Sequence, residues 1–340
     1  MVGTATPLLA AARAGDEHAF GLLVGPHRGE LHAHCYRMLG SVQDAEDAVQ
    51  ETMLRAWRGL PRFEGRSSLR SWLYTIATNA SLKLIARRPA RMLPMAFGPA
   101  SDRGADPGEP LAESVWVEPY PGERLGDDGS PEARYERRES LELAFVAAVQ
   151  HLPARQRAVL LLREVLGFTA AEVATALATT VPSVNSALQR ARKATESRLP
   201  EQSQQATLRA LGDDGVRAVV GHYMDAWERG DIDAVVAMLT EDAILAMPPT
   251  ATWYRGRDAI ADFYRRVPLS GALHWRHVAT AANGQPAVGC YAWDADHDAF
   301  LPMVLDVLTL RDTRVSEITA FLSPERFADF GLPADLRPEG

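Results

Sequence analysis

Residues 152–193 read LPARQRAVLLLREVLGFTAAEVATALATTVPSVNSALQRARK. In the last part of this stretch, apolar side chains recur at helical spacing, which predicts a buried inner face made of Val181, Val184, Leu188 and Ala191. The side chains expected on the outer face are polar: Ser183, Asn185, Ser186, Gln189, Arg190 and Lys193. Thr180 is expected to cap the helix, and proline at position 182 is tolerated in a first turn. The pattern predicts two helices joined by a tight turn.

This arrangement is typical of a helix-turn-helix, whose second helix reads the major groove of DNA. Asn and Gln side chains can pair with adenine and Arg with guanine, while Ser and Lys can hold phosphates. A helical hairpin with a merely solvated outer face is the alternative. The outer face is only mildly basic, so we expect the isolated chain to bind DNA weakly. Ala178 occupies the turn, at a cost in free energy if its φ is positive.

A second informative stretch lies upstream. Residues 44–88 read DAEDAVQETMLRAWRGLPRFEGRSSLRSWLYTIATNASLKLIARR, and periodicity predicts helices over residues 8–23, 27–39, 44–59 and 68–88. Residues 89–131 are rich in Pro, Gly and Asp without sustained periodicity, which predicts a flexible linker. Within it, VWVEPYP (residues 115–121) is apolar enough to dock somewhere instead of forming free coil.

Together the two stretches resemble sigma factors of the extracytoplasmic-function group. The resemblance implies a region 2 helical bundle over residues 1–90, a linker over 91–131, and a region 4 helix-turn-helix over 132–200. It also implies two partners, promoter DNA and bacterial core RNA polymerase, the latter bound through its β′ clamp and β flap. The contact residues for the clamp would be Asp44, Asp47, Gln50, Glu51 and Leu54.

The resemblance also assigns promoter-reading roles. Residues expected at the −10 element are Phe63, Arg66, Ser67, Asn79, Lys83, Arg87 and Arg88. The six outer-face residues named above, from Ser183 to Lys193, would read the −35 element. Trp72 and Tyr74 could stack on bases, although core packing is the more common role of Trp72 at such spacing. A metal site at HAHC (residues 32–35) is not expected, because neighbours at i and i+2 do not share a helix face. No cofactor is predicted.

A third domain is predicted over residues 208–335. Two helices are followed by strand-like pieces, AILAM, HWRHVATAA, AVGCYAW, FLPMVLDVLTL and VSEITAFL, which predict an α+β fold with a curved antiparallel sheet. This part resembles the SnoaL-like, ketosteroid-isomerase-like group, a cone-shaped fold also described as NTF2-like. The whole chain is therefore expected to be multidomain, with two all-α domains followed by an α+β domain.

Isomerases of this group need a carboxylate base and an oxyanion hole made from a tyrosine and a protonated aspartic acid. By resemblance, Tyr223 and Asp306 fall on the last two positions, while Met247 falls on that of the base. A thioether cannot abstract a proton, so we expect no enzyme activity. A pocket for a small apolar ligand could remain at Tyr223, Trp227, Met247 and Asp306. The alternative is that these side chains are ordinary core.

Charge divides unevenly along the chain. The net charge is −8, but residues 1–88 and 141–199 each carry +3, whereas residues 89–140 carry −5 and residues 200–340 carry −9. This asymmetry suggests DNA contact by the two basic modules and masking by the acidic domain in cis. No apolar run of 18 residues, no signal peptide and no disulfide framework is apparent, which favours the cytoplasm without membrane attachment.

The sequence thus predicts a sigma factor whose C-terminal domain regulates its activity in cis. One alternative is a ligand-sensing helix-turn-helix regulator that acts without core polymerase. It predicts specific duplex binding by the isolated chain. Another is an enzyme with a DNA-binding appendage, which the missing base disfavours.

Overall fold

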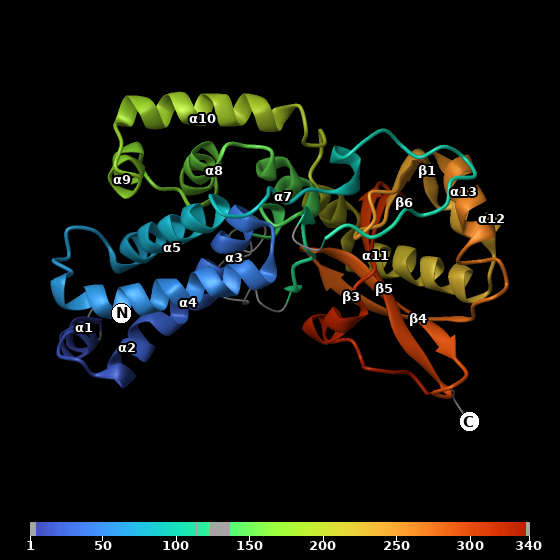
Figure 1. Ribbon diagram of the computed structural model, residues 1–340, viewed down its shortest axis with the longest axis horizontal. Helices are drawn as coiled ribbons and strands as arrows, with labels where there is room; N and C mark the ends of the chain where they lie inside the picture. The colour runs from blue at the N-terminus through green and yellow to red at the C-terminus, as the bar shows by residue number, and fades with distance from the viewer. Residues whose placement is uncertain (1–4, 113–114, 123–136, 338–340) are drawn as a thin grey trace. The chain divides into compact units, whose positions relative to one another are not determined.

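The computed structural model describes residues 5–112, 115–122 and 137–337 (Figure 1). These residues form two compact units. The first contains residues 5–91, 137–140 and 144–199, and the second contains residues 92–122, 141–143 and 200–337. Within the described ranges, no helix has the length and apolar character needed to cross a membrane.

The first unit begins with helices α1 to α5, which span Ala5–Arg13, Glu17–Val24, Arg28–Leu39, Val42–Gly59 and Leu69–Ile85. The prediction of one helix over residues 8–23 is wrong, because the chain breaks between α1 and α2. Gly15 has a φ of +95°, a conformation that residues with a side chain rarely adopt. The Asp16 carboxylate then accepts the backbone N–H of Ala19 at 3.0 Å and starts α2.

Serine caps set the start of α4 and α5. Ser41 Oγ accepts the backbone N–H of Asp44 at 3.1 Å, so α4 begins two residues before the predicted start. Ser68 Oγ accepts the backbone N–H of Ser71 at 3.0 Å, and α5 follows directly. Helix α5 ends at Ile85, three residues before the predicted end. Each cap satisfies a backbone donor that the first helical turn leaves without a partner.

The rest of the first unit holds helices α7 to α10, which span Leu143–Gln150, Ala154–Leu160, Ala170–Ala176 and Val181–Glu196. Helix α8 continues into a π-helical turn, Leu161–Val165. A capping box between Thr169 and Glu172 starts α9. The predicted helix-turn-helix is confirmed as α9, a short turn and α10 (Figure 1).

The described residues 200–337 of the second unit combine three α-helices with a six-stranded sheet. Helices α11, α12 and α13 span Gln204–Glu228, Ile232–Ala237 and Arg257–Arg266. Strands β1 to β6 span Leu239–Ala246, Trp253–Arg255, Trp275–Ala282, Gln285–Asp294, Ala299–Arg311 and Arg314–Phe321. The α+β prediction is confirmed, and the strand β2 adds to the five predicted pieces.

The sheet is mixed, which corrects the prediction of an antiparallel one. Its strand order is β2-β1-β6-β5-β4-β3, and β1 pairs with β6 in parallel while the other neighbours are antiparallel. The strands β1 and β6, far apart in sequence, thus lie side by side inside the sheet, and only β2 lies beyond β1. Helices α11 and α13 pack on it through one apolar core that includes Val220, Ile260 and Phe263.

Part of the segment predicted to be a flexible linker packs on the second unit. Trp116, Val117 and Tyr120 are buried, and the backbone of Tyr120 exchanges hydrogen bonds with Asn283. Trp253 Nε1 donates to a backbone carbonyl of the same segment at 3.0 Å. The described part of this segment, residues 92–112 and 115–122, therefore gains fixed partners without forming a long helix or strand of its own. Residues 113–114 and 123–131 of the predicted linker lie outside the described residues.

Candidate nucleic-acid interface

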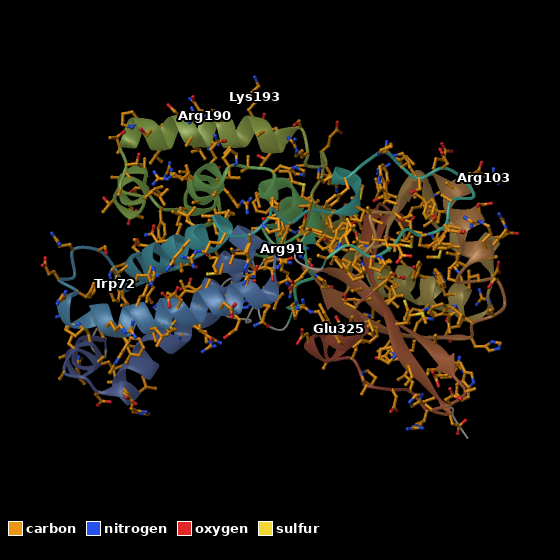
Figure 2. The ribbon with its side chains drawn as sticks, viewed as in Figure 1. Trp72, Arg91, Arg103, Arg190, Lys193 and Glu325 are labelled. Carbon is orange, nitrogen blue, oxygen red and sulfur yellow. The ribbon has the colours of Figure 1, made fainter. Side chains whose placement is uncertain are left out.

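Helix α10 presents one polar, solvent-exposed face. Its inner face is formed by Val184, Leu188 and Ala191, which are all buried. The six residues predicted to face outward are all exposed: Ser183, Asn185, Ser186, Gln189, Arg190 and Lys193. Figure 2 shows Arg190 and Lys193 on the outer side of α10, pointing away from the helices beneath it. The prediction that Val181 faces inward is wrong, because it lies in the first turn and is 39 % exposed.

The turn between α9 and α10 contains a strained residue. Ala178 has a φ of +48°, in the left-handed region that disfavours a residue with a Cβ. Thr180 Oγ1 accepts the backbone N–H of Ser183 at 3.3 Å, which confirms the predicted cap. The turn geometry is thus the one in which glycine is more stable than alanine.

Helix α4 carries all five residues predicted to contact polymerase. Asp47, Gln50 and Leu54 are exposed, and Leu54 is exposed by 52 %, unusual for a leucine. Glu51 is half-buried, and its carboxylate lies 2.7 Å from Arg55 Nε. These side chains follow the i, i+3, i+4 and i+7 spacing that places them on one helix face.

Asp44 does not share that exposure. Its side chain is buried at the start of α4, where its carboxylate pairs with Arg88 and with Arg91 Nη2, the latter at 3.1 Å. Both arginines lie after the end of α5. The structure therefore joins one residue predicted for polymerase contact to one predicted for the −10 element.

The other residues predicted for the −10 element lie around α5. Arg66 and Ser67 are exposed in the loop that precedes it, and Asn79, Lys83 and Arg87 are exposed on or just beyond it. Phe63 is different, because its side chain is only 9 % exposed and packs on Trp72 with ring centroids 4.9 Å apart. Tyr74 is buried as well.

The sequence analysis missed the contacts that join α5 to the segment of the helix-turn-helix. The Arg70 guanidinium lies over the rings of Tyr74 and Phe168, at 4.8 Å and 5.6 Å from their centroids. Asn79 Nδ2 donates to the backbone carbonyl of Ala176 at 3.4 Å. A single sequence offers no signal for such long-range pairs.

Arg157 is a second residue that the sequence reasoning missed. It is 3 % exposed and donates to the backbone carbonyl of Met38 and to two oxygens of Gln150. Burial lowers the pKa of its guanidinium to about 10. The Gln150 amide in turn donates to the backbone carbonyl of Arg37 at 3.0 Å, so α7 and α8 close over the end of α3.

The core of the second unit contains the predicted tyrosine and aspartate pair. The Tyr223 hydroxyl donates a hydrogen bond to Asp306 Oδ2 at 2.9 Å, and Cys290 Sγ lies 3.5 Å from the same oxygen. Burial raises the pKa of Asp306, although hydrogen bonds from Tyr223 and Cys290 act in the opposite direction. Burial also raises the pKa of the Tyr223 hydroxyl. Trp227 and Met247 are buried in the same apolar core, at 7 % and 5 % exposure.

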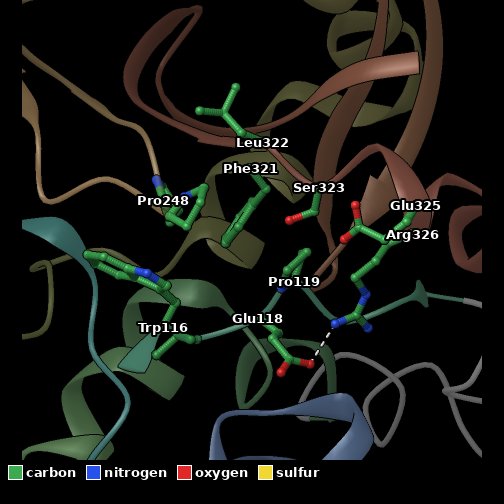
Figure 3. A pocket seen from close by; sticks show the side chains of 11 residues that line it. Trp116, Glu118, Pro119, Pro248, Phe321, Leu322, Ser323, Glu325 and Arg326 are labelled. Carbon is green, nitrogen blue, oxygen red and sulfur yellow. Dashed lines mark hydrogen bonds and ion pairs between the residues drawn. The ribbon is translucent and has the colours of Figure 1, made fainter. Parts of the chain in front are cut away.

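A pocket of the second unit lies elsewhere (Figure 3). Residues 116–119 form one part of its wall. Pro248 and Pro249, which follow β1, and Phe321, at the end of β6, form another part. The ion pair between Glu118 and Arg326 crosses its edge. Within the part of the chain that the structure covers, no three His, Cys, Asp or Glu side chains gather in a way that could hold a metal ion.

Comparison with known families gives three matches. Residues 23–90 match Sigma-70 region 2, residues 142–194 match Sigma-70 region 4, and residues 220–318 match the SnoaL-like domain. The order of the three is the order expected from the sequence.

Sigma factors are among the similar proteins and structures, and two of them match most of this chain. The ECF RNA polymerase sigma factor SigG of Mycobacterium tuberculosis is 44 % identical over 328 residues, which cover 95 % of this chain and 86 % of SigG. The RNA polymerase sigma-H factor of Pseudomonas aeruginosa is 32 % identical over 54 % of this chain and 88 % of its own length. The crystal structure of the extracytoplasmic function sigma factor SigJ of M. tuberculosis superimposes with a TM-score of 0.57 at 25 % identity, covering 90 % of this chain and 97 % of SigJ. With a relative this similar over nearly its whole length, the chain belongs to the extracytoplasmic-function sigma factors and carries a C-terminal SnoaL-like domain.

Proposed function

We propose that the chain binds bacterial core RNA polymerase and directs it to promoters, with the SnoaL-like domain regulating this activity in cis. The observation that carries the proposal is the face of α10, where all six predicted −35 residues are exposed over a buried apolar face. A recognition helix needs this division between a packed side and a side free for base edges. Since polymerase transcribes in the cytoplasm, we place the protein there.

The proposed surface for the β′ clamp consists of Asp47, Gln50, Glu51 and Leu54. An exposed leucine surrounded by polar side chains suits a protein interface, whose centre is apolar and whose rim is polar. The helix-turn-helix domain would meet the β flap. For the −10 element, the exposed candidates are Arg66, Ser67, Asn79, Lys83, Arg87 and Arg88. We also propose a role for Phe63 at the −10 element. This role requires its ring to move away from Trp72, or a base to reach the small part of the side chain that is exposed.

The SnoaL-like domain would act without catalysis. Met247 occupies the position at which the isomerase resemblance expects the base, and a buried thioether accepts no proton at neutral pH. Tyr223 and Asp306 are hydrogen-bonded to each other, which supports the part of the proposal that assigns them to the pair. A small apolar ligand near Tyr223, Trp227, Met247 and Asp306 remains part of the proposal.

Catalysis can be tested directly. We expect the full chain to show no ketosteroid isomerase activity. Activity that is present and disappears in Tyr223→Phe would overturn the assignment as a non-enzyme.

Core binding is tested by co-elution of the full chain with bacterial core RNA polymerase, beside the double variant Asp47→Arg/Glu51→Arg. Stoichiometric binding that the variant loses supports the sigma activity. Specific binding of promoter duplex by the isolated chain, without any co-elution, would instead support a regulator that acts without polymerase.

Regulation in cis is supported by the charge division, +3 for residues 141–199 and −9 for residues 200–340. A truncation after Leu199 would test it, but it would also leave Val117 and Tyr120 without the unit on which they pack. We therefore pair it with Asp213→Asn/Asp214→Asn in the full chain, at two exposed positions. If the acidic charge regulates the sigma activity, the truncation and the double Asn variant should both transcribe from promoters more than the wild type does at low salt. Equal transcription by all three proteins would overturn it.

A further inference from the structure

Asp44 differs from the residues proposed to bind the β′ clamp. Asp47 and Leu54 are exposed, whereas the Asp44 side chain is 4 % exposed. Its two oxygens accept from different residues, Oδ1 from Arg88 and Oδ2 from Arg91. A carboxylate covered in this way cannot present its charge to a second protein unless both pairs break. Its position at the start of α4 points to an internal role.

Asp44 and Gly40 both lie next to the buried Arg91 side chain. The Arg91 side chain is 7 % exposed and reaches Asp44 Oδ2 at 3.1 Å. Gly40, which ends α3 with a φ of +69°, lies next to Arg91. A Cβ at position 40 would come within 3.3 Å of Arg91 Cβ and of Gln150 Cδ. Glycine thus leaves the space into which this arginine fits.

Arg88 occupies a different position. Its side chain is 41 % exposed, and it lies three residues after the last residue of α5. A guanidinium has five N–H donors, so pairing with Asp44 leaves donors directed at solvent. The exposed Lys83 and Arg87 lie on the same stretch, which is proposed to follow the backbone of the −10 element.

We propose that Asp44 is a positioning residue for promoter binding and does not contact core polymerase. It orders the Arg88 guanidinium, so that this side chain meets a promoter phosphate without first losing its rotamer freedom. Arg91 supplies the second positive charge that keeps the buried carboxylate compensated while Arg88 engages DNA. The inference rests on the proposed function, because it needs the −10 segment to bind promoter DNA.

The test compares Asp44→Asn, Arg88→Gln and the double variant in the full chain. We expect all three to co-elute with core polymerase as the wild type does, and both single variants to open promoters less. Loss of the Arg88 phosphate contact should lower the slope of log affinity against log salt by about one. The double variant should open promoters as well as Arg88→Gln alone does, because both substitutions remove the same Asp44–Arg88 interaction. Gln43→Ala, at an exposed position in the same turn, is the control and should change neither readout.

Two results would overturn the inference. One is loss of core co-elution in Asp44→Asn, as in the Asp47→Arg/Glu51→Arg variant. The other is additive losses in the double variant. Failure of the wild type to bind core would instead remove the proposed function, so the two failures are distinct. If Asp44→Asn does not fold, as judged by thermal unfolding, Asp44→Glu keeps the charge and is combined with Arg88→Gln in the same cycle.

Discussion

Glu118 and Arg326 form an ion pair, with Oε2 and Nη1 2.6 Å apart, that fixes the segment before the helix-turn-helix domain to the chain after β6 (Figure 3). Both side chains are 19 % exposed. Burial lowers the pKa of Arg326, but the carboxylates of Glu118 and Asp329 outweigh it and raise the pKa above its ordinary value. Together with the buried Val117 and Tyr120, this pair explains how a segment without a long helix or strand is held on the second unit.

Removing this pair should weaken the second unit. We expect Arg326→Gln to lower its free energy of unfolding by about 1–3 kcal/mol, because Glu118 loses its cationic partner in a mostly buried site. The measurement is chemical denaturation, with limited proteolysis to detect cleavage among residues 92–122. Arg217→Gln is the control, since its pair with Asp214 is 71 % and 97 % exposed, and its effect should stay within about 0.5 kcal/mol. Equal effects of the two variants would show that the buried pair adds nothing.

Ala178→Gly should stabilise the helix-turn-helix domain. Ala178 has a φ of +48°, which costs a residue with a Cβ free energy that glycine does not lose. We expect a gain of about 0.5–1 kcal/mol in the free energy of unfolding, measured by urea denaturation. Ala187→Gly, inside α10, is the matched control and should lose about 1 kcal/mol. A loss in both variants would mean that flexibility of the glycine outweighs the strain at the turn.

Helical periodicity predicted helices α3, α4 and α5 and the outer face of α10. It worked there because the packed and exposed sides of a helix alternate every three to four residues. It failed at Val181, which follows the same period but lies in the first turn, where no preceding turn covers it. It also merged α1 and α2, since the apolar pattern continues across Gly15.

The local sequence pattern could not predict contacts between residues that are far apart in the chain. Nothing in the spacing of Asp44 separates it from Asp47, because only the folded chain brings Arg88 and Arg91 to it. The parallel pairing of β1 with β6 likewise depends on how the sheet closes, and β2 has only three residues, too few for a period to appear. The Tyr223–Asp306 pair was predicted from the resemblance to a known fold, not from its residues alone.

The Asp306 carboxyl should make the stability of the second unit depend on pH. Burial raises its pKa above the ordinary value of 3.8, so the folded state holds a proton that the unfolded state has released. Between the ordinary pKa and the raised pKa, the folded state binds more protons than the unfolded state. The free energy of unfolding therefore falls as pH rises from about 4 towards the raised pKa. Asp306→Asn should remove this fall. Urea denaturation of both proteins over a series of pH values gives the difference.

The matched control for this prediction is Asp296→Asn, at an exposed position of the same unit. We expect it to keep the pH dependence of the wild type. If Asp306→Asn and wild type keep the same difference in unfolding free energy at every pH, the carboxyl is not protonated in the folded state. Its hydrogen bond from Tyr223 would then outweigh its burial.

Arg190 and Lys193 should contribute to promoter binding in different ways. Both are exposed on α10 (Figure 2), so alanine at either position should leave folding unchanged. Arginine pairs with a base edge in a fixed bidentate geometry, so Arg190→Ala should cost the holoenzyme about 1–3 kcal/mol and relax its preference at one base pair. Lysine acts as a point charge on phosphate, so Lys193→Ala should weaken all sequences alike and lower the salt slope by about one. Arg192→Ala is the control, since this side chain pairs with Glu164 at 2.7 Å and should not affect DNA binding. Identical losses across all promoter sequences in both variants would mean that α10 holds the backbone without reading bases.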